Sequence, residues 1–516
     1  MSMNFIVENL GAEGARLGRW ICSNGVSALH TPGCMLYTGS GSVPNLGTEL
    51  LAAFPSLPAV CQISVASTYG RPSTATLQAL KKSLLEFYKL SKTSSSSYVS
   101  VQEATQCVDH SFNENKTVSI WTECERIKLS PDAYMSFQQA ARPDAFESLC
   151  DTVASSSTAA SKRCSRSVDR TLQHLDRCLE LRATMPELQH SAVFGVVEGG
   201  SFVEHRVRSA KETAKRPVAG FAFEGLEVKP DTLESVMTTV QAAVAELPAD
   251  KPRIFHGPAS PEDIVRLVEC GIDIFDSSYP YLLAENGIAL NLDLALESCD
   301  SDVDEGCMAA CPCPAAPSAA AAASNSGADS SSAATASDST SAGAAVQSPS
   351  SVAETSATSD STVAESRLAE ATTATPHAPS SVPGETTATG EERPNIAGAV
   401  AHPDFSKRRT PSVALGRDVH SFELDLTLDR YLDDFGKLSV NCQCPACSQG
   451  CTRAYAYHLL KNGELLADIH LMQHNLYSYI TFFQALRNSA QITDAGKRAN
   501  AWHRLKQCTR NSTAAA

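Results

Sequence analysis

Three cysteines that lie within six residues, Cys442, Cys444 and Cys447, are the most specific chemical signal in the sequence. A tight turn with this spacing can direct three sulfur atoms toward one point, and thiolates are preferred ligands of Zn²⁺. Three thiolates and one histidine saturate a tetrahedral ion and leave no position for water. The spacing therefore predicts one structural Zn²⁺ ion rather than a catalytic metal.

The fourth ligand must come from another part of the chain. His474 follows an expected helix over Arg453–Leu460 and a turn at Asn462-Gly463, and this order of elements returns it toward the thiols. Other residues nearby could compete for the same position: Cys451, His458 and His470. A second group of thiols at Cys307, Cys311 and Cys313 has no histidine nearby, and we expect these cysteines to be free.

The composition changes abruptly in the middle of the chain. From about Cys307 to Pro394 the residues are mainly Ala, Ser and Thr, without Phe, Trp, Tyr or Ile. Such a segment cannot bury enough apolar surface to offset the entropy lost on ordering, so we expect a disordered insertion. Between residues 300 and 393 there are 13 acidic and 2 basic residues, which account for −11 of the net charge of −15.

The remaining chain alternates short apolar runs with amphipathic helical patterns. Expected strands are Gln62–Ala66, Val193–Val197, Val218–Phe223, Arg253–Phe255 and Ile272–Phe275, and expected helices are Arg170–Arg182, Thr232–Glu246 and Pro261–Cys270. Strands that alternate with helices favour a parallel sheet with crossover helices, which at this length is most economically an α/β fold of the (β/α)8 barrel type. A doubly wound open sheet is the alternative, but no GxGxxG motif follows any expected strand.

We predict three regions from these patterns. Residues 1–300 form the main part of the barrel, 301–395 the low-complexity insertion, and 396–510 a zinc-binding subdomain with the last barrel elements. No apolar run approaches the roughly 20 residues that span a bilayer, so we expect no integral membrane segment. The N-terminus lacks the features of a secretory signal, and a cytoplasmic protein is the interpretation that follows.

Several motifs resemble those of the tRNA-guanine transglycosylases. The cysteine motif is similar to that of the family's zinc subdomain, and matching stretches precede it in the family's order: Leu129-Ser130-Pro131-Asp132, Phe194–Gly200, Gly220–Leu226 and Gly271–Asp276. The resemblance implies a (β/α)8 barrel with an inserted zinc subdomain and Cys442, Cys444, Cys447 and His474 as ligands. It also places Asp276 at the position of the family's nucleophile, at the carboxyl end of a strand, where barrel active sites lie. By itself, Asp276 could equally be a carboxylate that accepts hydrogen bonds from loop amides.

The sequence departs from the family where the chemistry requires further groups. No Asp occurs before Asp109, so the family's second carboxylate is missing from its D-S-G-G motif, and Glu103 is the nearest substitute. The segment 277–286 contains no arginine, although the family holds RNA phosphates there. Asp151 lies near the family's base-recognising aspartate, but a surface acid at this position is about as probable.

These departures resemble a non-catalytic member of the family that forms a heterodimer with a catalytic paralogue. The resemblance implies exchange of guanine for queuine at wobble position 34 of tRNAs with GUN anticodons, giving queuosine, and peripheral association with the mitochondrial outer membrane. Contact with tRNA is expected from basic residues near the C-terminus: Arg487, Lys497, Arg498, Arg504, Lys506 and Arg510. A solvated helix face is an equal alternative for them. Two other functions stay open, a self-sufficient transglycosylase that uses Asp276 with Glu103, and a zinc-stabilised scaffold that binds RNA or protein.

Overall fold

A computed structural model describes residues 3–11, 14–106, 112–122, 125–154, 159–226, 233–292 and 420–509 of the chain. The described residues on both sides of the long central gap belong to one compact unit, within Met1–Ser298 and Ala401–Ala516. The predicted low-complexity insertion, its three cysteines and Arg510 lie outside the described residues. Within the described part, no helix has the length and apolar content needed to cross a membrane.

Eight parallel strands close into a barrel, as predicted. The strands are β4 (Gly33–Thr38), β5 (Val60–Ser64), β6 (Ser96–Ser100), β9 (Ala145–Glu147), β10 (Ala192–Val197), β11 (Gly220–Phe223), β12 (Arg253–Phe255) and β13 (Ile274–Asp276). Pairing of Phe275 in β13 with Cys34 in β4 completes the circle. Apart from β6, whose five residues include three serines, the strands are mainly apolar because both of their faces are covered, one by helices and the other by the barrel interior.

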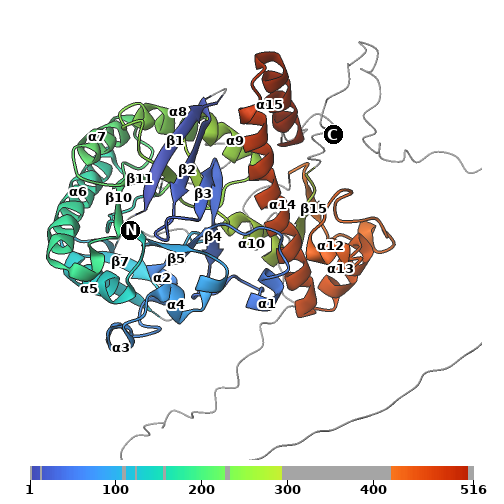
Figure 1. Cartoon of the computed structure of the whole chain (residues 1–516), viewed down its shortest axis with the longest axis horizontal. Helices are drawn as coiled ribbons and strands as arrows, with labels where there is room; N and C mark the ends of the chain where they lie inside the picture. Colours follow the sequence, from blue (N-terminus) through green and yellow to red (C-terminus); the bar gives the residue numbers. More distant parts are fainter. Residues whose placement is uncertain are drawn as a thin grey trace, which may run out of the picture. The chain divides into compact units, whose positions relative to one another are not determined.

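Helices surround the barrel, as the green part of Figure 1 shows. These crossover helices are α5 (Pro131–Ala141), α6 (Ser161–Thr184), α7 (Val203–Ala214), α8 (Leu233–Val244) and α9 (Pro261–Glu269). The predicted start of α9 is confirmed, since Ser260 and Asp263 form a reciprocal capping box and Pro261 occupies the first turn. One expected strand, Gln62–Ala66, was displaced by two residues: β5 begins at Val60, and Ser64 ends it by capping the short helix α2 (Val65–Thr68).

A three-stranded antiparallel sheet covers the amino ends of the barrel strands. It consists of β1 (Asn4–Leu10), β2 (Arg16–Ile21) and β3 (Ala28–Thr31). Trp20 of this sheet packs edge-on against Phe194 in the barrel, at 5.2 Å between ring centroids. Arg16 forms a buried ion pair with Asp273 at 3.0 Å. This end of the barrel is therefore closed, and any site must lie at the carboxyl ends of the strands.

Smaller elements complete the first part of the chain. They are the hairpin of β7 (Val118–Trp121) and β8 (Arg126–Leu129), the helices α1 (Thr48–Leu51), α3 (Thr74–Leu80), α4 (Leu84–Phe87) and α10 (Ser278–Glu285), and two 3₁₀ turns, Leu90–Lys92 and Pro186–Leu188.

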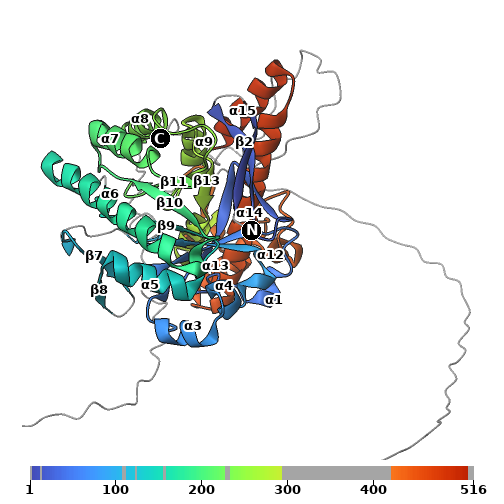
Figure 2. The ribbon, with the colours of Figure 1, turned by 60° about the vertical axis from the view of Figure 1, so that its left-hand side comes forward.

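The chain on the two sides of the gap is joined by an antiparallel pair of strands. β14 (Ile288–Leu290) pairs with β15 (Glu423–Asp425), with Leu290 opposite Glu423. The 3₁₀ turn Asp429–Tyr431 and the helices α12 (Pro445–Ser448), α13 (Arg453–Lys461), α14 (Leu465–Gln491) and α15 (Ala495–Thr509) follow. Figure 2 shows how far the long helix α14 extends.

Helix α14 connects the C-terminal part with the barrel. Its 27 residues span about 40 Å, and its contacts include α10, α12, α13, β14 and β4. Phe483 packs against Phe275 of β13 at 5.6 Å between ring centroids, and the Tyr479 hydroxyl donates to the carbonyl of Ala259 at 2.9 Å. The same helix therefore borders both the cysteine motif and the barrel wall.

We predict that residues 303–400 can be replaced by a short Gly/Ser linker without loss of the fold. The β14–β15 pair keeps the two ends adjacent, and loop-closure entropy depends only on the logarithm of loop length, about 0.6 kcal/mol per doubling. Thermal unfolding of the shortened chain should begin no lower than that of the full chain. A clearly lower unfolding temperature would show that the barrel depends on the removed residues.

Candidate metal centre and barrel mouth

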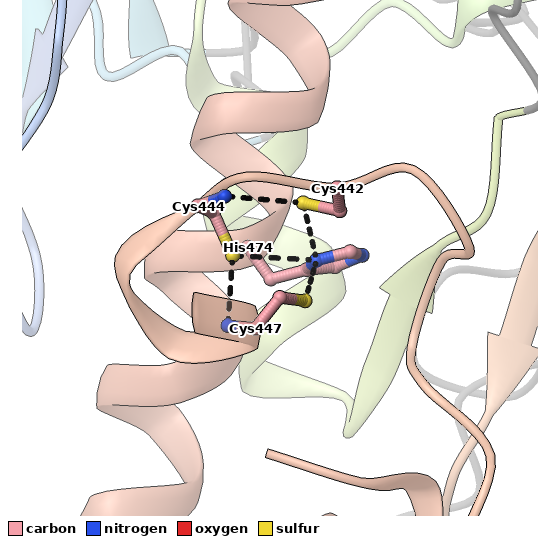
Figure 3. Close-up of side chains that lie close together, drawn as sticks. All are labelled: Cys442, Cys444, Cys447 and His474. Carbon is pink, nitrogen blue, oxygen red and sulfur yellow. Dashed lines mark hydrogen bonds between the residues drawn. The ribbon is translucent and has the colours of Figure 1, made fainter. Parts of the chain in front are cut away.

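The three cysteines and His474 converge on one point, as Figure 3 shows. The Nδ1 atom of His474 lies 3.4 Å from the sulfur of Cys442, 3.7 Å from that of Cys444 and 3.3 Å from that of Cys447. In a zinc tetrahedron with ordinary bond lengths, a sulfur and a nitrogen ligand are about 3.6 Å apart. The cluster can therefore hold a metal ion of the size of Zn²⁺ without rearrangement.

Local backbone structure positions the sulfurs. Cys444 precedes α12, and its sulfur accepts a hydrogen bond from the backbone amide of Cys447 at 3.3 Å. The sulfur of Cys442 accepts from the amide of Cys444 at 3.5 Å. These bonds favour the thiolate form, because an amide donor stabilises negative charge on sulfur. The turn that the spacing predicts thus also prepares the thiols for a cation.

A second hydrogen bond orients the His474 ring. Its Nε2 atom lies 2.6 Å from the carbonyl oxygen of Leu290. A carbonyl can only accept, so Nε2 carries the proton and Nδ1 offers its lone pair to the metal. The neighbouring Asn475 fixes the same strand, because its Oδ1 accepts from the amide of Leu290 at 2.9 Å and its Nδ2 donates to Ile288 at 2.9 Å.

The competing ligands do not join the cluster. The thiol of Cys451 donates toward the backbone of Thr452, and burial raises its pKa to about 11. His458 is exposed and contacts Asn462, while His470 lies against the Tyr455 ring. Of the four fourth-ligand candidates, only His474 has a ring nitrogen within reach of the three sulfurs.

At the carboxyl ends of the barrel strands, Asp276 is buried, and both of its carboxylate oxygens accept hydrogen bonds. Its Oδ2 accepts from the amide of Gly257 at 2.8 Å, and its Oδ1 accepts from the amide of Ser278 at 3.0 Å and from the Ser278 hydroxyl. Only 1% of its surface is exposed. The carboxylate of Asp276, which the sequence resemblance placed at the nucleophile position, therefore serves as an acceptor for two loop amides and a hydroxyl.

His256 beside Asp276 was not recognised in the sequence. Its Nε2 lies 3.0 Å from Glu147 and 3.1 Å from the Tyr98 hydroxyl, and its Nδ1 lies 3.9 Å from Asp276. Burial alone would lower the pKa of His256, but the negative charge of Glu147 and the hydrogen bond with Asp276 raise it well above the ordinary 6.5. The carboxylates of the barrel mouth therefore favour the protonated form of His256.

A third carboxyl group, Glu224, faces this histidine. Burial and the charge of Glu147 raise the pKa of Glu224 well above 4.5. Oxygen and nitrogen atoms of Glu147, Glu224 and His256 come within 4.8 Å of one another, a spacing that a metal ion can also bridge. Here the positive charge of His256 already compensates one carboxylate, so we interpret the group as an internal charge network.

Asp151 is not the surface acid that one interpretation of the sequence expected. It is fully buried, and Arg163 donates to both of its carboxylate oxygens, at 2.6 and 2.9 Å. Arg170 contacts the same carboxylate at 3.1 Å and Asn113 at 2.8 Å. No oxygen of this carboxylate is left without a donor, so Asp151 cannot recognise a base in this arrangement.

The basic residues near the C-terminus do not form one free surface. Arg487 is largely buried and donates to the carbonyl of Pro32 at 2.8 Å, and Lys506 pairs with Glu269. Arg498 donates to the carbonyl of Ile492 at 3.0 Å. Lys497 and Arg504 are exposed on α15. The sequence alone could not separate the two groups, because the partners of the first are distant in the chain or lie on backbone carbonyls.

The family model described as "Queuine tRNA-ribosyltransferase" matches residues 12–325 and 402–503. The chain belongs to the queuine tRNA-ribosyltransferase family. The resemblance inferred from the sequence motifs is thereby confirmed.

Three relatives within this family match nearly the whole chain. The protein from Gallus gallus is 32% identical over 94% of this chain and 93% of its own length. The proteins from Danio rerio and Homo sapiens are 33% and 30% identical, each over 92% of this chain and 93% of the relative. All three are named "Queuine tRNA-ribosyltransferase accessory subunit 2".

We predict that Cys444→Ser lowers the metal content of this queuine tRNA-ribosyltransferase family member toward zero, because a serine hydroxyl does not replace a thiolate on a soft metal site. The matched control is Cys451→Ser, which removes a neighbouring buried thiol outside the cluster. Elemental analysis of the purified proteins measures both. A normal metal content in Cys444→Ser would mean that other residues hold the ion.

We also predict that Glu224→Gln stabilises the protein at neutral pH. A carboxyl whose pKa is higher in the folded than in the unfolded state stabilises the fold at acid pH. This stabilisation is lost as the pH rises from the pKa of the unfolded state to that of the folded state. Gln cannot ionise, so the variant should have a higher free energy of unfolding than the unchanged chain at pH 7.5 and nearly the same one at pH 4. Urea unfolding at the two pH values measures this, with the exposed Glu125→Gln as control. An equal effect at both pH values would contradict the raised pKa.

Proposed function

We propose that this chain is the non-catalytic subunit of a queuine tRNA-ribosyltransferase. It pairs with a catalytic subunit that exchanges guanine for queuine at wobble position 34 of tRNAs with GUN anticodons, giving queuosine. The observation that carries the proposal is the match of more than nine-tenths of the chain to relatives named as the accessory subunit.

The state of Asp276 supports a non-catalytic role. A nucleophile needs an oxygen that can approach the sugar carbon, whereas both oxygens of Asp276 accept hydrogen bonds from the chain itself. His256 lies on the same side and compensates the local negative charge. An attacking carboxylate would have to give up these contacts in every turnover.

The charge beside Asp276 supports the same conclusion. Helix α10, which begins two residues after Asp276, contains no lysine or arginine and ends in Glu285. RNA phosphates require cations for positioning and affinity. Among the described residues, the basic side chain beside this carboxylate is His256, which is buried and paired with Glu147 and so is not placed to hold a phosphate.

We infer that the cysteine cluster holds one structural Zn²⁺ ion. Three thiolates and His474 fill a tetrahedron, so the ion has no site for substrate and serves the fold. Exposed apolar side chains precede the cluster, with exposed fractions of 58% for Leu432, 75% for Phe435 and 74% for Val440. Three exposed apolar side chains within nine residues of the sequence favour this region as the surface that pairs with the catalytic subunit.

Binding of tRNA by the pair is part of the proposal. In this chain we assign backbone contact to the exposed Lys497 and Arg504 rather than to all six basic residues near the C-terminus. We place the pair in the cytoplasm, with peripheral attachment at the mitochondrial outer membrane as the finer expectation.

Base exchange by the purified chain, with and without a catalytic subunit, tests the proposal. Labelled queuine should enter tRNA only when the two subunits are mixed. Asp276→Asn in this chain should change the rate of the pair less than about twofold, and circular dichroism checks that the variant is folded. Turnover by this chain alone would favour the self-sufficient transglycosylase. A folded chain that neither pairs with a catalytic subunit nor raises its activity would favour the scaffold.

A further inference from the structure

A pocket of about 270 Å³ opens at the carboxyl ends of β4, β5 and β6. The side chains that define its chemistry are Tyr37, Tyr281, Trp121 and Glu103. The remaining lining residues are small or uncharged, and no lysine, arginine or histidine of the described chain is among them. The proposed function does not use this pocket.

Aromatic rings from two elements form one wall. The rings of Tyr37, at the end of β4, and Tyr281, in α10, are stacked with 5.8 Å between centroids and 28° between planes. Trp121 belongs to the β7–β8 hairpin, and its indole Nε1 is buried without a hydrogen-bond partner among the described residues. A buried donor of this kind is costly unless a ligand or water accepts from it.

The polar group of the pocket is a buried carboxylate. Glu103 is 7% exposed and accepts from the Tyr37 hydroxyl and, at 2.6 Å, from the Ser64 hydroxyl. Both donors are neutral, so no described side chain offsets a negative charge on Glu103. Burial raises the pKa of this carboxyl, and the nearby charge of Asp276 adds to the effect.

The surroundings are also acidic. Burial raises the pKa of Tyr281 to about 12, and the charged groups that add to the shift are Glu285, Glu103 and Asp468. The described cation next to the pocket is Arg126, whose guanidinium lies 4.2 Å from the Phe112 ring and 5.9 Å from the Trp121 ring. The pocket therefore repels phosphate and attracts positive charge.

We propose that this pocket binds an organic cation, an ammonium or guanidinium group, with Glu103 as its counter-ion. The faces of Tyr37 and Tyr281 contribute cation–π attraction, which is strongest where water is excluded. The Trp121 Nε1 donates to a water molecule beside the cation, because a guanidinium or ammonium group has no acceptor atom. The source of the cation is either a free small molecule or a lysine or arginine side chain of a partner protein.

Titration of the full, metal-loaded chain with methylguanidinium tests the proposal, with methylurea as the neutral probe of similar shape. Calorimetry and the fluorescence of Trp121 report binding, and a Trp121→Phe variant identifies its signal among the three tryptophans. We expect saturable binding of methylguanidinium and at least tenfold weaker binding of methylurea. Equal binding of the two probes, or no saturable binding of the cation, would overturn the proposal.

Two variants connect the binding with the named residues. Glu103→Gln keeps the size of the side chain and removes its charge, and should weaken methylguanidinium binding at least tenfold. Tyr281→Leu removes one ring from a half-buried position and should weaken it severalfold. Glu125→Gln, an exposed acid outside the pocket, should bind as the unchanged chain does. Unchanged affinity in folded Glu103→Gln would overturn the assignment.

Adding the catalytic subunit separates the two sources. If the cation belongs to that subunit, pairing displaces methylguanidinium and Glu103→Gln weakens pairing. If it is a small molecule, the pair still binds methylguanidinium and Glu103→Gln pairs normally. Both results are readings of binding rather than of base exchange, so failure of this proposal leaves the proposed function untouched.

Discussion

The hydrogen bond between His474 Nε2 and the carbonyl of Leu290 connects the two parts of the molecule. It fixes the tautomer that the metal requires, and it ties α14, which carries this histidine, to β14, the strand that follows the barrel and α10. A second hydrogen bond links the same two segments, because the Oδ1 of Asn475 accepts from the amide of Leu290. Farther along α14, Tyr479 and Phe483 contact the barrel wall. The cysteine cluster and the packing against the barrel wall therefore depend on the same helix.

The barrel mouth follows from a different constraint, the cost of burying charge. Each ionised carboxylate in it must find donors or a cation, because unpaired charge in a dry interior is unfavourable by several kcal/mol. Asp151 pairs with two arginines, Asp276 accepts hydrogen bonds from loop amides, and Glu147 pairs with His256. A catalytic site keeps such groups incompletely satisfied so that substrate can complete them. In this chain the protein itself supplies the partners, which favours stability over reactivity.

The sequence predicted what depends on local pattern. Alternating strands and helices indicated the barrel, and the cysteine spacing indicated three of the cluster residues. His474 could be chosen only by the order of elements, since His470 lies one helical turn earlier on the same helix. His256 carries no motif, and its role depends on strands that are distant in sequence, so it was missed. Burial of Asp151 had a detectable signal: Arg163 and Arg170 are seven residues apart and lie on one face of α6. The burial of Arg487 had no detectable signal in the sequence, because the guanidinium donates to a backbone carbonyl 455 residues away.

The short β14–β15 ladder has a consequence for how the polypeptide can be divided. It lies where the two halves of the chain meet, and the α14 contacts add a large apolar interface between the same halves. A backbone broken between residues 293 and 419 leaves every described strand pair and the whole cysteine cluster intact on the two sides of the cut. The contacts between the two pieces would then be the β14–β15 ladder, the hydrogen bonds of His474 and Asn475 to β14, and the packing of α14 against the barrel. The described contacts between the two pieces therefore do not require an unbroken backbone between residues 293 and 419.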